Sequence, residues 1–312
     1  MSAQSMTYQL NKNILAVITY SDVLNMPLTG FEIWKHLIAY SRDNGLCDQP
    51  CSLGDVQKLL LSGQLSGKIE EKNGLYFLCG HSGLVERRIS AEKLSVKKLK
   101  RMRSLVRFIA YLPYVRMLGV RGSLAMQNGE KGSDWDVFVV LRAGKIWMGR
   151  TMLTGFLHLI GKRRYGKKIY DRMCLNYFVT EDNLEIGTKD LFSAHEYRFL
   201  IPLLNFPLFQ IFELKNRWIR EYKPNYSQTI IPHAWSIPET ASSRRIRAVL
   251  EGFFDNFHLE KWLASWQREK IRHNPKTSLE GSLIEANDRA LIFLPHPSGP
   301  RIFQAFKERL SA

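Results

Sequence analysis

Two aspartates and a glycine-serine pair give one short stretch of this chain an evident capacity for chemistry. Gly122 and Ser123 follow an apolar run, and Asp134 and Asp136 open a second apolar run after a polar loop. Side chains alternate along a strand, so the two aspartates project on one face and Trp135 on the other. Carboxylates that close repel each other unless a cation lies between them. The stretch therefore predicts a divalent-metal site beside a phosphate-binding turn.

Each of these residues suits metal-assisted chemistry on a polyphosphate. Gly122 lets a phosphate approach the backbone, and Ser123 offers a hydroxyl and an N–H at the start of a short helix. Asp134 and Asp136 are of the type that holds one or two Mg²⁺ ions, which neutralise charge as a phosphate is attacked. A plain turn beside a solvated pair of aspartates is the alternative without function.

The order Gly122-Ser123, spacer, Asp134-x-Asp136 within an apolar strand resembles the signature of the DNA polymerase beta-type nucleotidyltransferase superfamily. Ser133 directly before Asp134 is similar to the arrangement in minimal nucleotidyltransferases. The resemblance covers residues 115–180 and implies a small mixed-sheet domain. It also implies Mg²⁺-dependent transfer of a nucleoside monophosphate from an NTP, with ATP as first candidate, to an acceptor hydroxyl. Gly122 and Ser123 would then cradle the phosphates, and Asp134 and Asp136 would bind the metal.

One element of the family pattern is missing, because members usually carry a third acidic residue on a later strand. On the predicted strand 173–179 the polar residue is Asn176, our third catalytic candidate. An amide can donate a hydrogen bond or lend its oxygen to a metal, but it cannot act as a general base. Either two carboxylates suffice, or Glu181, Asp182 or Glu185 substitutes. Otherwise the protein is catalytically impaired and acts as a nucleic-acid-binding or regulatory module.

Basic residues after the second predicted strand are candidates for binding the triphosphate. Arg142 and Lys145 lie just beyond this strand, and Arg150 lies in the helix that follows. Each could reach a phosphate, although a residue of this type is more often a plain surface cation. His195 and Glu196 lack a second matching ligand in the sequence, so we expect a structural role for them.

Three predicted helices and a hairpin precede the central stretch. Apolar spacing predicts a helix over residues 10–20, Thr29-x-x-Glu32 has the form of a capping box, and Ser52 begins a third helix. Asn73-Gly74 predicts a hairpin turn. This order is typical of a winged helix-turn-helix, which we assign to residues 9–82. Its third helix holds one lysine and no arginine, so nucleic-acid contact and a packing role are equal alternatives.

The remaining segments complete a predicted α+β multidomain protein. Residues 83–112 predict a basic linking helix, whose stretch 84–112 is either a solvated face or a surface that tracks nucleic-acid phosphates. Residues 113–188, with the order strand, turn, strand, helix, strand, form the predicted nucleotidyltransferase domain. Residues 189–312 predict a mainly helical region: short helices over 189–222, broken by Pro202 and Pro207, a long helix over 242–273, and a final hairpin and helix.

Composition and charge limit the classes of protein that fit. The 312 residues are 45% hydrophobic, enough for substantial cores, and the formal net charge of +16 suits nucleic acid, a nucleotide or an acidic membrane surface. No secretory signal or membrane span is evident, so we expect a cytoplasmic protein. The cysteines lack the spacing of a zinc site and are expected to be free thiols; they are Cys47, Cys51, Cys79 and Cys174.

Overall fold

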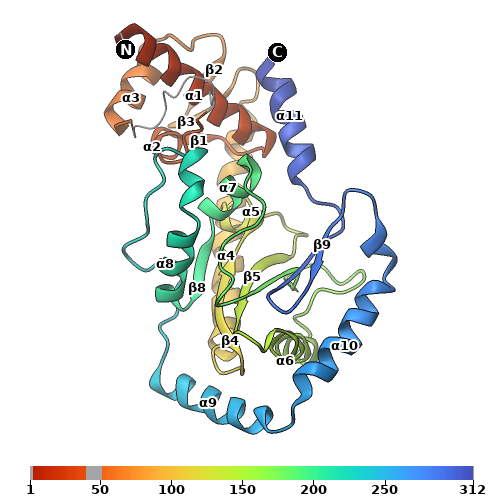
Figure 1. The fold of residues 1–312 in the computed structure, drawn as a ribbon. Coiled ribbons are helices and arrows are strands. Elements are labelled where there is room, and N and C mark those ends of the chain that lie inside the picture. Colours follow the sequence, from red (N-terminus) through yellow and green to blue (C-terminus); the bar gives the residue numbers. More distant parts are fainter. Residues whose placement is uncertain (1–2, 40–50, 312) are drawn as a thin grey trace.

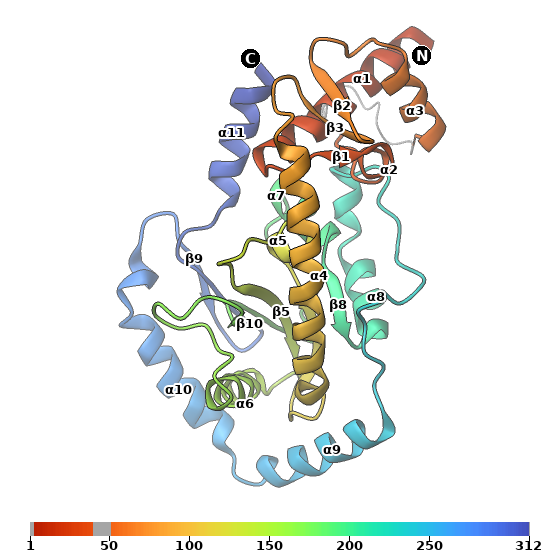
Figure 2. The ribbon, with the colours of Figure 1, turned by 180° about the vertical axis from the view of Figure 1, so that it is seen from behind.

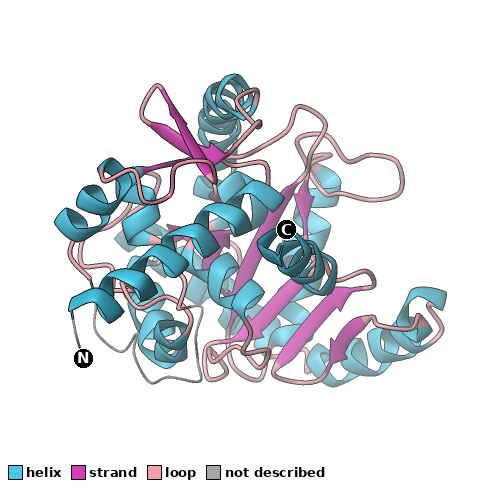
Figure 3. Ribbon diagram, turned by 90° about the horizontal axis from the view of Figure 1, so that it is seen from above, coloured by secondary structure: helices cyan, strands magenta, loops and turns pink. Residues whose placement is uncertain are grey.

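The computed structural model describes residues 3–39 and 51–311 and shows an α+β protein in that part of the chain (Figure 1). These residues form eleven α-helices, a seven-stranded mixed sheet and a three-stranded antiparallel sheet, and Figure 3 shows the two sheets apart from each other. None of the helices in these ranges is long and apolar enough to cross a membrane.

The N-terminal elements surround the small sheet and bear out the predicted signals. They are α1 (Ala3–Val23), β1 (Leu28–Thr29), α2 (Gly30–Lys35), α3 (Leu53–Leu61), β2 (Ile69–Lys72) and β3 (Leu75–Leu78). The Thr29–Glu32 capping box is present, and Ser52 caps α3. Asn73 and Gly74 both have positive φ angles, 57° and 77°, as a two-residue turn between twisted strands requires.

A long helix and the C-terminal helix connect this region to the rest of the molecule. The predicted linking helix is α4 (Leu84–Ile109), which runs from the small sheet to the far end of the large one (Figure 2). The last helix, α11 (Gly299–Ser311), packs beside α1. An ion pair between Arg309 and Asp22 joins these two helices.

The large sheet is bigger than predicted, because strands from beyond residue 188 extend it on both sides. Its strands follow the order β8-β4-β5-β7-β10-β9, and β6 also pairs with β5. The strands β6 and β7 run parallel to β5, and the other pairs are antiparallel. The strands are β4 (Val115–Val120), β5 (Trp135–Leu141), β6 (Met173–Cys174), β7 (Tyr177–Thr180), β8 (Ile201–Leu204), β9 (Leu283–Ala286) and β10 (Ala290–Leu294).

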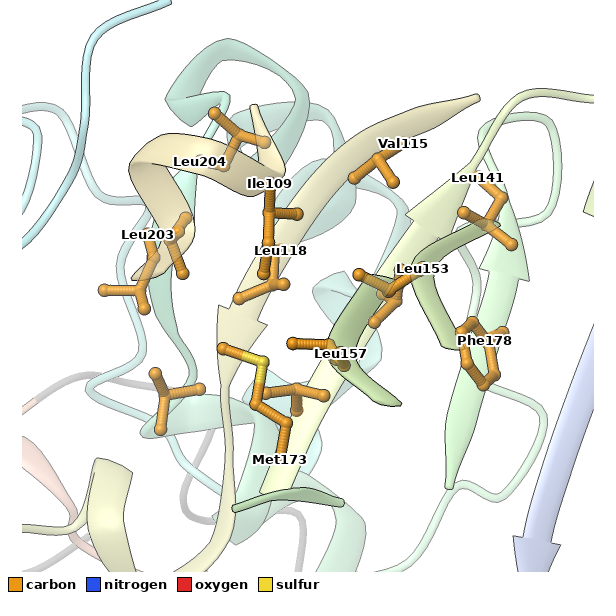
Figure 4. Packing of buried hydrophobic residues seen from close by; sticks show 14 of the residues in the cluster. Ile109, Val115, Leu118, Leu141, Leu153, Leu157, Met173, Phe178, Leu203 and Leu204 are labelled. Carbon is orange, nitrogen blue, oxygen red and sulfur yellow. The ribbon is translucent and has the colours of Figure 1, made fainter. Parts of the chain in front are cut away.

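Helices cover both faces of this sheet, and the alternation along β5 sets which side chains meet them. Val137, Val139 and Leu141 pack with α4 and with α6 (Ile146–Leu159), the cluster in Figure 4. Phe138 and Val140 pack with α7 (Leu191–Arg198) and α8 (Phe206–Lys215) on the other face. Because Trp135 joins the first cluster, the two neighbouring aspartates share the second face, as predicted.

Three predicted elements differ from the structure. The region 189–222 contains a strand, β8, where Pro202 is tolerated because β8 is the edge strand beside β4. An isolated bridge also joins Leu204 to Ile237. The predicted strand 173–179 is split into β6 and β7 at Leu175 and Asn176. The predicted long helix 242–273 is two helices, α9 (Ala241–Asp255) and α10 (Leu259–Arg272), because His258 turns the chain with a φ of 51°.

The remaining helices of the described residues are short. One-turn helix α5 (Gly122–Ala125) follows β4, and the 3₁₀ helices are η1 (Arg217–Glu221) and η2 (Pro275–Ser278). Cys79 and Cys174 are free thiols, as expected, and Cys47 lies outside the described residues.

Candidate functional site

The predicted phosphate and metal residues meet at one end of the large sheet. Val120, the last residue of β4, pairs with Val137 of β5, and the Arg121 N–H donates to the Asp136 carbonyl at 3.0 Å. Gly122 has a φ of 67°, and a Cβ there would lie 3.1 Å from Asp136 Oδ2. Both the backbone angle and the close carboxylate require glycine. The turn α5 starts here, so its first N–H groups have no intrahelical acceptor.

A buried lysine of α4 fixes the loop that leads into Asp134. Lys98 is 1% exposed, and its ammonium donates to the Glu130 carbonyl at 2.6 Å and to the carbonyl and hydroxyl of Ser133 at 2.7 Å and 2.9 Å. At least one cation of the predicted basic helix therefore serves neither solvation nor nucleic-acid contact. It holds the start of the strand that carries the aspartates.

Asp134, Asp136 and Cys174 form a group that could hold a metal ion. One ligand atom from each lies within 4.8 Å of the others. Burial raises the pKa of Cys174 to about 12, so without a metal ion its thiol is protonated at neutral pH. Sequence reasoning missed Cys174 as a site residue. Its only signal is its place two residues before Asn176, which puts both on one side of an extended segment.

Asn176 lies beside Asp136, where a third ligand would be sought. Its Nδ2 is 3.4 Å from Asp136 Oδ1, and its own Oδ1 is buried with no hydrogen-bond partner among the described residues. Mg²⁺ takes carboxylate and amide oxygens. Two carboxylates and an orphaned amide oxygen therefore fit this ion better than they fit a soft metal.

The electrostatics of the aspartate pair also favour a cation. Burial raises the pKa of Asp136, and the neighbouring charge of Asp134 raises it further, while the Arg121 guanidinium opposes the rise. Arg164 lies 2.8 Å from Asp134 Oδ2 and donates to Cys174 Sγ at 3.1 Å. A divalent ion between the carboxylates would stabilise their charged forms.

A buried ion pair that the sequence did not indicate supports the glycine turn. Arg121 donates to Glu196 through Nη2 at 3.1 Å and through Nε at 3.3 Å, and its guanidinium lies 4.9 Å from the Tyr177 ring centre. The expected structural role of Glu196 is therefore borne out. Glu196 lines the same cavity as Asp136, but both its oxygens accept from Arg121, so it does not supply a free third carboxylate. The other expected structural residue, His195, is buried and lies 3.1 Å from the Lys223 ammonium.

The three proposed substitutes for the third carboxylate lie away from the aspartates. In the parallel pairing, Thr180 at the end of β7 lies opposite Leu141, about 16 Å along β5 from Asp136. Glu181 follows at this far end, where it pairs with Arg116. Asp182 and Glu185 form exposed ion pairs with surface cations. None of the three lines the cavity described next.

Arg142 and Lys145 also lie at the far end of β5. Arg142 forms ion pairs with Glu251 and Asp255 of α9, at 3.3 Å and 3.0 Å, and Lys145 pairs with Asp255 at 2.5 Å. We therefore withdraw both residues as triphosphate ligands. Nearness to Asp136 in the sequence is misleading here because β5 carries the chain across the sheet before these residues occur.

A cavity of about 1510 Å³ opens beside Gly122, Ser123, Asp136 and Asn176. Helices α6, α10 and α11 and the loops around residues 163–166 and 295–298 complete its wall. Cations outnumber acids in the lining; the arginines and lysines are Arg87, Arg121, Arg150, Arg163, Arg164, Lys270, Lys276 and Arg301, and the acids are Glu130, Asp136 and Glu196. The cavity is therefore suited to an anion.

Arg150 is the cation of this wall with the clearest need for an anionic ligand. Burial lowers its pKa to about 10, and the positive charge of Arg163 adds to this effect. Its guanidinium donates to Gln267 and lies 4.8 Å from the Phe293 ring centre, and it forms no ion pair with a carboxylate of the described residues. A phosphate would satisfy this charge.

We expect Arg150→Met to weaken nucleotide binding by about tenfold or more, because a charge-assisted contact to phosphate is lost. Arg142→Met removes the same charge at the other end of β5 and should leave nucleotide affinity unchanged. Titration of each folded variant with a fluorescent NTP analogue and Mg²⁺ measures both constants. Equal loss in the two variants would show that the cavity's charge has no local role.

No family model, curated protein or solved structure matches this chain. The function must therefore be argued from the site itself. The geometry brings together Gly122, Ser123, Asp134, Asp136 and Asn176, five of the seven predicted site residues, and separates Arg142 and Lys145 from them.

Proposed function

We propose that this chain is a Mg²⁺-dependent nucleotidyltransferase that transfers a nucleoside monophosphate from an NTP to an acceptor hydroxyl. The observation that carries the proposal is the contact between Gly122 and Asp136: a carboxylate oxygen lies 3.1 Å from where a Cβ would stand on Gly122, at the start of a helical turn whose first N–H groups have no intrahelical acceptor. A phosphate bound at the Gly122 turn and a metal ion bound by Asp136 would therefore lie next to each other. A turn and a solvated aspartate pair with no function would not require this fit.

The residues divide the work of the reaction. Asp134 and Asp136 would hold Mg²⁺, with the Asn176 amide oxygen as a third ligand, and the bound ion would neutralise charge on the α-phosphate. Backbone N–H groups after Gly122 orient the polyphosphate, and Arg150 neutralises the leaving pyrophosphate. The acceptor oxygen would form a bond to the α-phosphorus as the bond from the α-phosphorus to the bridging oxygen breaks. Pyrophosphate would leave, and the hydroxyl proton would pass to solvent water. At about 1510 Å³ the cavity exceeds a usual small-molecule site of about 300–1000 Å³, which leaves room for an acceptor.

The N-terminal elements follow the order of a winged helix, α1-β1-α2-α3-β2-β3. We propose a packing role for this module. Its α3 and hairpin expose carboxylates beside their few lysines, which does not suit phosphate contact; the exposed charges are Asp55, Lys58, Lys68, Glu70, Glu71 and Lys72. Contacts of α1 with α11 give the module a structural partner instead.

Pyrophosphate release tests the proposed reaction. The purified chain is incubated with Mg²⁺ and each NTP, alone and with RNA, protein or small hydroxyl compounds as acceptors. Release that depends on Mg²⁺ and on one acceptor, and that is absent in Asp134→Ala, is the expected result. A second readout is the NTP label on the acceptor. Release that persists in Asp134→Ala would overturn the assignment of the metal site.

A catalytically impaired nucleotide-binding module is the second candidate. Asn176 occupies the place where the superfamily pattern has a third carboxylate, and among the described residues Glu196 is already engaged by Arg121. This candidate predicts Mg²⁺-dependent NTP binding at the same residues without pyrophosphate release under any acceptor. Binding and turnover measured on one preparation separate the two functions.

A further inference from the structure

Helix α9 buries the charged residues Arg247 and Glu251 against the protein and exposes several apolar side chains to solvent, while Phe254 packs against the core. Glu251 is 8% exposed, whereas Val249 is 72% and Phe253 57% exposed. Ile246 and Phe257 extend the exposed set at helical spacing, and both are exposed. This is the reverse of a helix that packs its apolar face on its own core. The inverted pattern indicates that something outside the chain covers the apolar side.

The orientation of α9 is fixed by its buried charges. Glu251 accepts hydrogen bonds from Nη1 and Nη2 of Arg116, at 2.8 Å and 2.9 Å, and from the Tyr114 N–H at 2.7 Å. Arg247 pairs with Glu239, which lies two residues before the start of α9. Rotating the helix to bury Phe253 would leave these charges without partners, at a large cost. The apolar side therefore stays outward.

Exposed aromatic and basic residues continue this surface past the bend into α10. Trp262 is 63% exposed, and Arg245 and Lys261 are exposed beside the apolar residues. The carboxylates of this region point inward: Asp255 pairs with Lys145, and Glu260 accepts from the N–H groups at the start of α6. We call this surface the α9–α10 face; it consists of Arg245, Ile246, Val249, Phe253, Phe257, Lys261 and Trp262.

We propose that the α9–α10 face docks on an anionic lipid surface. An exposed helix with aliphatic and aromatic residues on one side and cations beside them lies in the headgroup region, where acyl chains take the apolar groups and lipid phosphates attract the cations. Both helices lie at the edge of the molecule, α9 past the ends of the large sheet and α10 beside α6 (Figures 1 and 2).

Charge and side-chain type favour lipid over other occupants. A twofold contact with a second copy would bring Arg245 and Lys261 toward the same cations of the partner, with the local carboxylates turned inward. Nucleic acid would use the cations and the tryptophan, but Ile246 and Val249 offer nothing to phosphates or base edges. The proposal is independent of the nucleotidyltransferase reaction.

Vesicle co-sedimentation of the full chain tests the proposal. We expect binding to vesicles of phosphatidylcholine mixed with phosphatidylglycerol, weaker binding to phosphatidylcholine alone, and loss of binding as salt is raised, because the cations are screened. Trp262 should shift its emission to shorter wavelength on binding, in a comparison with Trp262→Phe. No binding of the folded chain to the anionic vesicles at low salt overturns the proposal.

A pair of double variants separates this face from apolar exposure in general. Val249→Ser with Phe253→Ser should weaken vesicle binding by about tenfold or more, because buried apolar area is lost. Ile230→Ser with Ile231→Ser removes comparable residues, 83% and 77% exposed, from a loop and should bind as the wild type does. Equal binding by both double variants overturns the proposal. The proposal is also overturned if Val249→Ser with Phe253→Ser abolishes a dimer or RNA binding while the vesicles bind neither the wild type nor this variant.

Discussion

Asp136→Asn is expected to abolish stabilisation by Mg²⁺ and NTP while raising the melting temperature of the protein in a metal chelator. The carboxylate is held by burial and by the charge of Asp134 in a setting that disfavours ionisation. Asparagine keeps the shape and removes the charge, so it relieves the repulsion in the absence of a cation. With a cation the same change removes a ligand. Turnover should fall by about a thousandfold or more, a loss typical of a charge-stabilising group.

The pH dependence follows from the direction of the same shift. Because the pKa of Asp136 is raised on folding, the folded protein holds its proton more tightly than the unfolded chain. Stability then falls as pH rises from the unfolded value through the folded one. The stabilising effect of Asp136→Asn should therefore be present at neutral pH and disappear in acid. Mg²⁺ affinity of the wild type should fall as pH is lowered, because the ion competes with the proton.

Thermal unfolding followed with and without Mg²⁺ and ATP checks these expectations. Asp182→Asn is the matched control, since Asp182 pairs with Arg289 on the surface and lies away from the cavity. The control should keep the full ligand-induced shift. If Asp136→Asn kept it too, the proposed metal site would be wrong.

Features that depend on a few neighbouring residues could be predicted from the sequence. The Thr29 capping box, the Asn73-Gly74 turn and the start of β4 all follow from local backbone preferences. The approach of Gly122 to Asp136 could also be inferred, because Gly122 lies just after β4, Asp136 lies at the start of β5, and residues 121–134 join these strands into an antiparallel pair.

Features set by position across the sheet could not be predicted. Arg142 follows Asp136 by only six residues, yet β5 carries the chain to its opposite end before Arg142 occurs. Strand β8 was missed because a proline in a short apolar run reads as a helix break, and only its pairing at the edge allows it. Arg121 has no sequence signal at all, since its importance comes from Glu196, a residue far along the chain.

The inverted helix α9 shows a different limit. Its spacing predicts an amphipathic helix, and the usual expectation is that the apolar side is buried. Here Glu251 binds Arg116 and the backbone of Tyr114, so the charged side is the inner one. Helical spacing defines two faces, and the charges of partners far away in the sequence decide which one is buried.

Removal of the Glu196 carboxylate should produce the largest loss of stability among the changes considered. In Glu196→Ala the Arg121 guanidinium stays buried, 5% exposed, without its partner. Breaking a buried ion pair in this way costs about 3–5 kcal/mol of the free energy of unfolding. Glu185→Ala removes an exposed carboxylate that pairs with Lys189 and should leave the free energy of unfolding almost unchanged.

Urea unfolding of these two variants measures the difference, and a third variant identifies its cause. If the cost of Glu196→Ala arises from the stranded guanidinium, then Arg121→Met combined with Glu196→Met should recover most of the stability, because apolar side chains can replace a buried pair. A double variant as unstable as Glu196→Ala would place the cost in lost packing instead. Gly122 follows Arg121 directly. If ATP still stabilises the recovered double variant, the Arg121–Glu196 pair is not needed to align the turn at Gly122; if ATP no longer does so, the pair aligns this turn.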